Sequence, residues 1–142
     1  MSMTGLLLRR TWTAVILLAT LALGCTRRDP SAQFKEATQA MKNGEYGAAI
    51  ELFTQVVAAQ PTNDSAYINR AACHAALKET DLMLSDADEA LTINGKNVPA
   101  LELLASYWHK DGDKKKAREY ALRLMEVEAD NGASRVLGAA GE

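Results

Sequence analysis

Apolar and small side chains recur at spacings of three and four from residue 34 onward, and no run alternates strictly between apolar and polar positions. This spacing places the apolar side chains on one face of a helix, so the pattern predicts an all-α protein. We expect helices at residues 32–42, 46–59, 65–77, 81–93, 99–110 and 114–128. Candidate N-caps, whose side chains accept a hydrogen bond from the first turn, are Asp64 or Ser65 for the third helix, Thr80 for the fourth and Asp113 for the sixth.

The helical pattern returns at a fixed shift of 34 positions. Alanine occupies positions 37, 71 and 105, and small side chains there allow the two helices of a unit to approach closely. Other apolar or small residues superpose after the same shift: Ala49 with Met83 and Ala117, Phe53 with Ala87 and Ala121, and Val56 with Ala90 and Leu124. We therefore expect three two-helix units over residues 32–131, with limits near 30–63, 64–97 and 98–131, and a C-terminal tail at 132–142.

The repeating unit resembles the tetratricopeptide repeat, a helix-turn-helix motif with the same period. The resemblance rests on Gly44-Glu45-Tyr46 through Pro61 and on Ala66-Tyr67-Ile68-Asn69-Arg70-Ala71, and it weakens at Glu36, Lys78 and Met83. It implies three tandem repeats in a short right-handed α-solenoid, where each unit buries its apolar face against its neighbours. The pattern lacks the usual polar capping helix, and we expect Val136 and Leu137 to fold back weakly onto the last helix.

The resemblance also implies a concave surface that is lined by the first helix of each repeat. The family's groove positions carry mostly small or weakly apolar side chains here, with a few hydrogen-bonding groups: Phe34, Thr38, Met41, Ile68, Asn69, Ala72, Ala76, Glu102, Leu103, Ser106 and His109. Such a surface suits an extended or helical protein segment. The alternative at each single position is a side chain that merely packs between helices.

One subtype of the family binds the C-terminal carboxylate of its ligands through two lysines, two asparagines and an arginine. Only Asn69 of this sequence matches one of those positions, and Phe34, Thr38, Pro99 and Leu103 occupy the others. None of these four side chains pairs with a carboxylate, so the sequence argues against this carboxylate clamp and against the binding of chaperone tails.

The N-terminal segment has the pattern of an export signal. Arg9 and Arg10 precede an uncharged run from Thr11 to Thr26, which is shorter than the roughly 17–25 residues of a spanning helix. We therefore expect a signal peptide at residues 1–24. An uncleaved membrane anchor is an alternative.

Leu21-Ala22-Leu23-Gly24-Cys25 resembles the lipobox of bacterial lipoproteins. The resemblance implies cleavage before Cys25 and lipidation of its thiol, which leaves residues 25–31 as a lipidated tether. Palmitate is an acyl chain that such a cysteine would carry. Thr26, which is not aspartate, implies the outer membrane, with the chain facing the periplasm. An incidental cysteine after an ordinary cleavage site is the alternative.

Composition narrows the chemistry of the chain. A net charge of −2 gives no electrostatic basis for binding nucleic acid, and two cysteines are too few for a disulfide scaffold or a four-cysteine zinc site. We expect the thiol of Cys73 to be buried and His74 to be a packed core residue. The acidic side chains of Asp81, Asp86, Asp88 and Glu89 and the run Lys114-Lys115-Lys116 are interpreted as solvated faces. No glycine-rich phosphate loop or catalytic arrangement is evident, so we expect no enzyme, no cofactor and no metal.

The sequence therefore predicts a lipid-anchored adaptor of the bacterial cell envelope. Its expected partner is a protein or peptide segment of an envelope complex, and its expected contact with the membrane is the N-terminal lipid. The alternative is a self-associating module whose end faces stack into oligomers, because three repeats leave apolar edges at the ends of the stack.

Overall fold

The computed structural model describes residues 29–139, with side chains described as far as Asp130, and this part of the chain consists of six helices without a strand. The helices pack as antiparallel neighbours in three pairs: α2 (Pro30–Lys42) with α3 (Tyr46–Ala59), α4 (Asp64–Ala76) with α5 (Thr80–Ile93), and α6 (Val98–Asp111) with α7 (Lys114–Ala139). The all-α, three-unit prediction is confirmed. Five helices lie within two residues of their expected bounds at each end, and α7 is longer.

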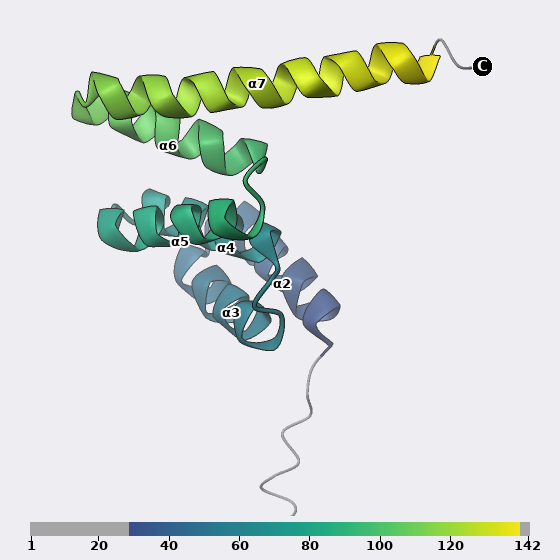
Figure 1. The fold of residues 1–142 in the computed structure, drawn as a ribbon. Coiled ribbons are helices and arrows are strands. Elements are labelled where there is room, and N and C mark those ends of the chain that lie inside the picture. Colours follow the sequence, from purple (N-terminus) through teal and green to yellow (C-terminus); the bar gives the residue numbers. More distant parts are fainter. Residues whose placement is uncertain (1–28, 140–142) are drawn as a thin grey trace, which may run out of the picture.

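The pairs stack in chain order, as Figure 1 shows from α2 and α3 at one end to α6 and α7 at the other. The second helix of one unit packs on the first helix of the next, α3 on α4 and α5 on α6. Contacts between the first helices, α2 with α4 and α4 with α6, are sparser. The more open face of the stack is therefore the one that α2, α4 and α6 line.

Asparagine side chains begin the second and third units. Asn63 accepts a hydrogen bond from the backbone N–H of Ala66 at 3.0 Å, and Asn97, its equivalent in the next unit, accepts one from Ala100 at 3.0 Å. Asp113 caps α7 by accepting from Lys116 at 3.0 Å, as predicted. The cap is the last non-helical residue, whose side chain reaches the N–H groups two or three positions on.

The caps predicted for α4 and α5 are wrong, because all three residues lie within these helices and not before them. Asp64 already lies within α4 and accepts from the adjacent N–H of Ser65 at 2.9 Å, and Ser65 lies within the same helix. Thr80 is the first residue of α5, and the residue before it, Glu79, makes no side-chain capping hydrogen bond.

Two clusters of buried side chains hold the stack together. Phe53, Val56 and Cys73 are fully buried where the first unit meets the second, and the Phe34 and Phe53 rings meet edge to face at 5.6 Å between centroids. Leu101 and Leu104 are fully buried where the second unit meets the third. The expected burial of Cys73 is confirmed, and burial raises the pKa of its thiol.

The alanines that recur every 34 residues differ in burial from unit to unit. Ala37 and Ala71 are fully buried, whereas Ala105, their equivalent in the last unit, is partly exposed. The described part of the chain supplies a following unit for the first two alanines and none for the third. Burial at this position therefore depends on a neighbour.

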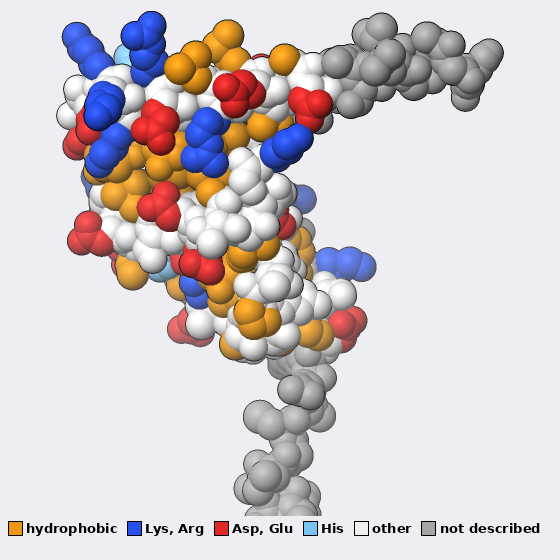
Figure 2. Space-filling model, viewed as in Figure 1, with side chains coloured by type: hydrophobic (Ala, Val, Ile, Leu, Met, Phe, Trp, Pro, Cys, Tyr) orange, Lys and Arg blue, Asp and Glu red, His pale blue; other side chains and the backbone are white. Residues whose placement is uncertain are grey.

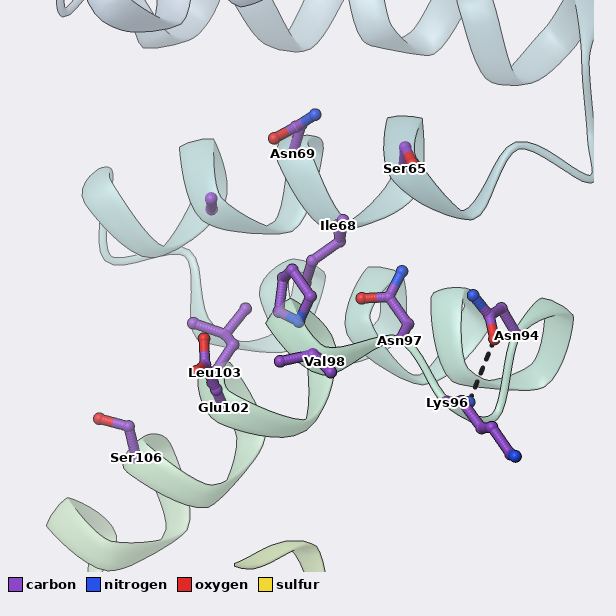
Figure 3. A pocket seen from close by; sticks show the side chains of 12 residues that line it. Ser65, Ile68, Asn69, Asn94, Lys96, Asn97, Val98, Glu102, Leu103 and Ser106 are labelled. Atoms are coloured by element: carbon purple, nitrogen blue, oxygen red, sulfur yellow. Dashed lines mark hydrogen bonds between the residues drawn. The ribbon is translucent and has the colours of Figure 1, made fainter. Parts of the chain in front are cut away.

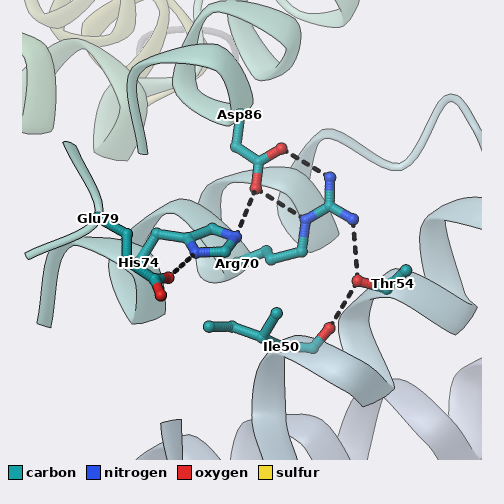
Figure 4. Close-up of polar contacts among 6 residues, drawn as sticks. All are labelled: Ile50, Thr54, Arg70, His74, Glu79 and Asp86. Atoms are coloured by element: carbon teal, nitrogen blue, oxygen red, sulfur yellow. Dashed lines mark hydrogen bonds and ion pairs between the residues drawn. The ribbon is translucent and has the colours of Figure 1, made fainter. Parts of the chain in front are cut away.

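A buried ion pair connects three helices at the centre of the stack (Figure 4). The guanidinium of Arg70 on α4 donates from Nε and Nη2 to the Asp86 carboxylate on α5 at 2.7 and 2.6 Å, and from Nη1 to the Thr54 hydroxyl on α3 at 3.1 Å. The hydrogen bonds to Asp86 raise the pKa of Arg70 above its ordinary value. The expectation that Asp86 lies on a solvated acidic face is wrong, because its residue is 6% exposed; Asp81, Asp88 and Glu89 are exposed as expected.

His74 extends this buried group. Its residue is 7% exposed, its Nδ1 lies 2.6 Å from Glu79 Oε2, and its Nε2 lies 3.8 Å from Asp86 Oδ2. The prediction of a packed core histidine is confirmed.

The C-terminal part of the chain continues as helix. The expectation that residues 132–142 form a tail, with Val136 and Leu137 folded back, is wrong as far as Ala139, because α7 runs without a break through both positions. Positions 132–139 include glycines but no proline, and a glycine costs a helix only about 1 kcal/mol. Figure 1 shows that α7 extends well past the end of α6.

The predicted signal peptide, Cys25 and most of the predicted tether lie outside the described residues. Among the helices that are described, none combines the length and the apolar character needed to cross a membrane.

The Arg70–Asp86 pair makes a prediction about stability. Asp86→Ala leaves a guanidinium charge without its carboxylate, and we expect a loss of about 3 kcal/mol, near the lower limit for a buried pair because 16% of the Arg70 side chain reaches solvent. Glu89→Ala, at an exposed position on the same helix, is the control and should change stability by less than about 0.5 kcal/mol. Urea unfolding followed by circular dichroism measures both, and equal losses would contradict this role for the pair.

Candidate functional site

A large pocket opens between α4 and α6, on the face of the stack that α2, α4 and α6 line. It has a volume of about 680 Å³, and Figure 3 shows side chains from α4, from α6 and from the connection before α6 around it. Its lining residues are Ser65, Ile68, Asn69, Ala72, Asn94, Lys96, Asn97, Val98, Pro99, Glu102, Leu103 and Ser106.

A smaller pocket of about 360 Å³ lies between α2 and the start of α4. Each of its six lining residues has an equivalent 34 positions later in the larger pocket: Ser31 with Ser65, Phe34 with Ile68, Lys35 with Asn69, Gln60 with Asn94, Asn63 with Asn97, and Ser65 with Pro99. The two pockets are therefore successive steps of one surface, which we call the concave groove. The 34-residue period of the sequence therefore produces two equivalent pockets along the groove.

The structure brings most of the predicted groove residues to this surface. Ile68, Asn69, Ala72, Glu102, Leu103 and Ser106 line the larger pocket, and Phe34 lines the smaller one.

The other predicted positions lie elsewhere or pack inward. His109 lines a pocket between α6 and α7, and Ala76 is exposed at the end of α4. The Thr38 hydroxyl donates to the backbone carbonyl of Phe34 at 2.8 Å, and Met41 packs against the first core cluster. The packing alternative therefore describes Met41 better, whereas the Thr38 hydroxyl bonds within its own helix.

The connection between α5 and α6 is the part of the groove that sequence reasoning missed. Asn94, Lys96 and Asn97 lie in this connection and Val98 begins α6, and all four line the larger pocket. The available signal was the same shift of 34, which aligns Asn94 and Asn97 with Gln60 and Asn63.

Hydrogen bonds hold this connection in place. The Asp64 carboxylate accepts from Nδ2 of Asn94 at 2.7 Å and from Nδ2 of Asn97 at 2.9 Å. Partial burial raises the pKa of Asp64, but these bonds and that from the Ser65 N–H outweigh it, so the pKa lies below its usual value. The connecting segment is thus fixed to the start of α4.

Lys96 forms a solvent-exposed ion pair with the last helix. Its ammonium lies 2.6 Å from Asp130 Oδ2, which raises the pKa of Lys96 and lowers that of Asp130 through their hydrogen bond and charges. A groove whose wall is fixed before the ligand arrives loses less conformational entropy on binding.

The chemistry of the groove is mixed. Ile68, Val98 and Leu103 give it an apolar floor, while Asn69 and Ser106 place an amide and a hydroxyl along its length. Glu102 adds a negative charge, whereas the ammonium of Lys96 is paired with Asp130. This combination suits a protein segment that presents an apolar side chain and backbone amides, and it gives no cluster of positive charge.

The positions of a carboxylate clamp fall in this groove without cations. Asn69, Pro99 and Leu103 line the larger pocket and Phe34 lines the smaller one. Phe34 also packs against Phe53, and Thr38 bonds to the backbone. The geometry thus places four of the five positions in the groove, and of these only Asn69 carries a side chain that can donate to a carboxylate.

Comparisons with known proteins agree with the fold. Residues 40–81 match the sequence model of the tetratricopeptide repeat family. The small glutamine-rich tetratricopeptide repeat-containing protein 2 of Saccharomyces cerevisiae is 32% identical over 96 residues, which is 68% of this chain and 28% of that protein. The chain therefore spans less than a third of the length of this curated relative.

Solved structures show the same helical stack. The crystal structure of MamA superposes with a TM-score of 0.72 at 16% identity and covers 75% of this chain and 63% of that one. The first tetratricopeptide domain of Spaghetti, bound to the HSP90 peptide SRMEEVD, superposes with a TM-score of 0.66 at 22% identity and covers 81% of this chain and 95% of that one. Residues 40–81 are thus a tetratricopeptide-repeat segment, and the described helices together form a three-unit solenoid of that fold.

Proposed function

We propose that this chain is an adaptor that holds a protein segment in its concave groove beside a membrane of the bacterial cell envelope. The observation that carries the proposal is the recurrence of the groove pocket from one repeat to the next, because it gives a ligand two equivalent subsites in line. The tetratricopeptide domain that binds SRMEEVD supports a peptide ligand. A non-enzymatic adaptor is also what the family match supports.

The partner is a segment of an envelope protein that is recognised by side chains and backbone groups within the segment, and not by its terminal carboxylate. The floor formed by Ile68, Val98 and Leu103 accepts an apolar side chain, and Asn69 offers both a donor and an acceptor to the ligand's backbone. A terminal carboxylate would meet no lysine or arginine at the clamp positions.

Photocrosslinking in intact cells tests the groove. A photoreactive residue in place of Ala72, which is exposed on α4 and lines the larger pocket, should give a discrete adduct to one envelope protein. The same residue in place of Ser85, exposed on α5, is the control and should give none. Asn69→Arg with Ser106→Arg should remove the adduct, because the long charged side chains fill the pocket, while helical circular dichroism stays unchanged. An adduct that survives both substitutions would show that the groove is the wrong surface.

The lack of a clamp is tested with the SRMEEVD peptide itself. Fluorescence anisotropy should show no saturable binding of the labelled peptide to the wild-type chain. The terminal carboxylate of the peptide would lose its hydration in the groove without gaining a cationic partner. Pro99→Lys with Leu103→Arg adds two cations beside Asn69 in the larger pocket and should produce binding that weakens with salt. Tight binding by the wild type would overturn our view of the partner.

The membrane anchor is the second part of the proposal, and the motif ending at Cys25 supports it. Helix α2 begins at Pro30, so five residue steps separate Cys25 from the first helix, at most roughly 18 Å when extended. A lipid on Cys25 would therefore keep the first unit next to the membrane surface, on the periplasmic side of the outer membrane. Several acyl chains on one cysteine would make that attachment stable, whereas one chain anchors only marginally.

Metabolic labelling tests the anchor. Cells grown with radiolabelled palmitate should label the wild-type chain and not Cys25→Ala, because the thiol is the acceptor of the lipid. Cys73→Ala is the matched control and should be labelled like the wild type, since Cys73 is buried. Equal labelling of the wild type and Cys25→Ala would remove the lipoprotein part of the proposal and leave the groove untouched.

A further inference from the structure

The outer face of α7 exposes large apolar side chains. Leu122 is 51% exposed and Met125 is 64% exposed, and Figure 2 shows apolar side chains along this edge of the molecule. Arg118, Leu122, Met125 and Ala129 follow one another at steps of four, three and four, so they lie on one helix face. The face turned toward α6 carries Tyr120, Leu124 and Val127, which belong to the core cluster of the last two units.

The exposure of Met125 departs from the pattern of the fold. Its equivalents at shifts of 34 are Val57 and Leu91, which are 8% and 9% exposed. Both lie on the second helix of a unit whose face is covered by the next unit, since α3 packs on α4 and α5 packs on α6. No helix among the described residues covers the same position on α7.

The end of the stack is open beside this face as well. A pocket of about 400 Å³ between α6 and α7 is lined by Ala105, His109, Lys114, Ala117, Arg118 and Ala121. Three of these residues, His109, Lys114 and Ala117, are the equivalents of Ala75, Thr80 and Met83, which line a pocket that α6 closes on its other side. Since α7 continues as one helix to Ala139, the chain does not turn back to fill it as far as that residue.

Charge along α7 indicates what covers this face. The first part of the helix is mainly basic, with Lys114, Lys115, Lys116, Arg118 and Arg123 against Glu119. The later part is mainly acidic, with Glu126, Glu128 and Asp130 against Arg135. Cations in the first turn are unfavourable in the helix's own dipole. A second α7 that runs antiparallel would bring its acidic part beside this basic start, whereas a parallel one would set like charges together.

We propose that the outer face of α7 binds a second copy of this chain, with the two α7 helices antiparallel around a two-fold axis at Leu122. In that register Leu122 faces Leu122 of the other copy, and Arg118 faces Glu126 twice by symmetry. Lys114 faces Asp130, which already binds Lys96 at 2.6 Å and would join the two chains in one charged network. Lys116 takes no part, because its ammonium lies over the Trp108 ring at 3.6 Å from the centroid.

The dimer leaves the concave groove free. The groove is lined by α2, α4, α6 and their connections, whereas the face that pairs is the side of α7 turned away from α6. The inference therefore does not depend on the proposed function, and a two-fold assembly would display two grooves. A contact that is one helix wide is small, so we expect a dimer that dissociates in the micromolar range.

Disulfide trapping in cells that produce the full chain tests the register. Leu122→Cys places two thiols on the axis and should give a covalent dimer upon mild oxidation. Leu82→Cys, equally exposed at 53% but on α5, is the matched control and should remain monomeric, as should the chain with its native cysteines alone.

Charge reversal identifies the antiparallel pairing. In the Leu122→Cys background, Arg118→Glu should lower the dimer yield about tenfold, because the axis repeats the repulsion with Glu126. Glu126→Arg alone should do the same, and the two reversals together should restore the yield. All three positions are exposed, so helical circular dichroism should be unchanged.

The proposal is overturned by a dimer yield at position 122 no higher than at position 82, by a yield that the single reversals do not change, or by a double reversal that does not restore the yield. Trapping of position 122 to a different protein would also overturn it, since that result assigns the face to another partner. The adduct from position 72 should persist in every α7 variant, so failure of the dimer and failure of the groove are separate outcomes.

Discussion

Each unit of this molecule can bury its apolar face only against the next unit, and this constraint explains most of what the structure shows. Ala37 and Ala71 are fully buried because a following helix covers them, and Val57 and Leu91 are buried for the same reason. The Arg70 side chain reinforces the stacking by bonding to α3 and α5 from its place on α4. Stability is therefore shared between neighbours, and no unit of the described chain forms a complete core alone.

The groove is a consequence of the same stacking. The second helices make the tighter contacts between units, so the first helices are left apart and their open side becomes a surface. Its two pockets repeat because the units that build them repeat. Function on such a scaffold resides in the side chains that line the groove, which is why a shared fold with MamA or with a peptide-bound domain does not by itself name a ligand.

Much of the fold could be read from the sequence because helix periodicity and the repeat shift are properties of single helices and of adjacent units. The features that were missed depend on contacts across units or on the exact end of a helix. Asp86 looks like its exposed acidic neighbours until Arg70 is placed beside it. Asn63 is the cap of a helix that begins one residue earlier than the sequence predicts, and the exact first residue of a helix is set by contacts that periodicity does not show. The groove residues Asn94 and Lys96 lie in a connection, where periodicity carries no signal.

The C-terminal end of the stack shows where the constraint is not met within one chain. A solenoid could end with a short polar helix, but here α7 continues straight and keeps Leu122 and Met125 on its outer face. Exposed apolar side chains favour association with another surface. By themselves they do not determine which partner binds or in which orientation. Charge separation removes that ambiguity, since it favours one orientation of an identical helix over the other. Within the chain, the second helix of a unit is covered by the next unit. In the proposed dimer, the second helix of the last unit would be covered by the other chain.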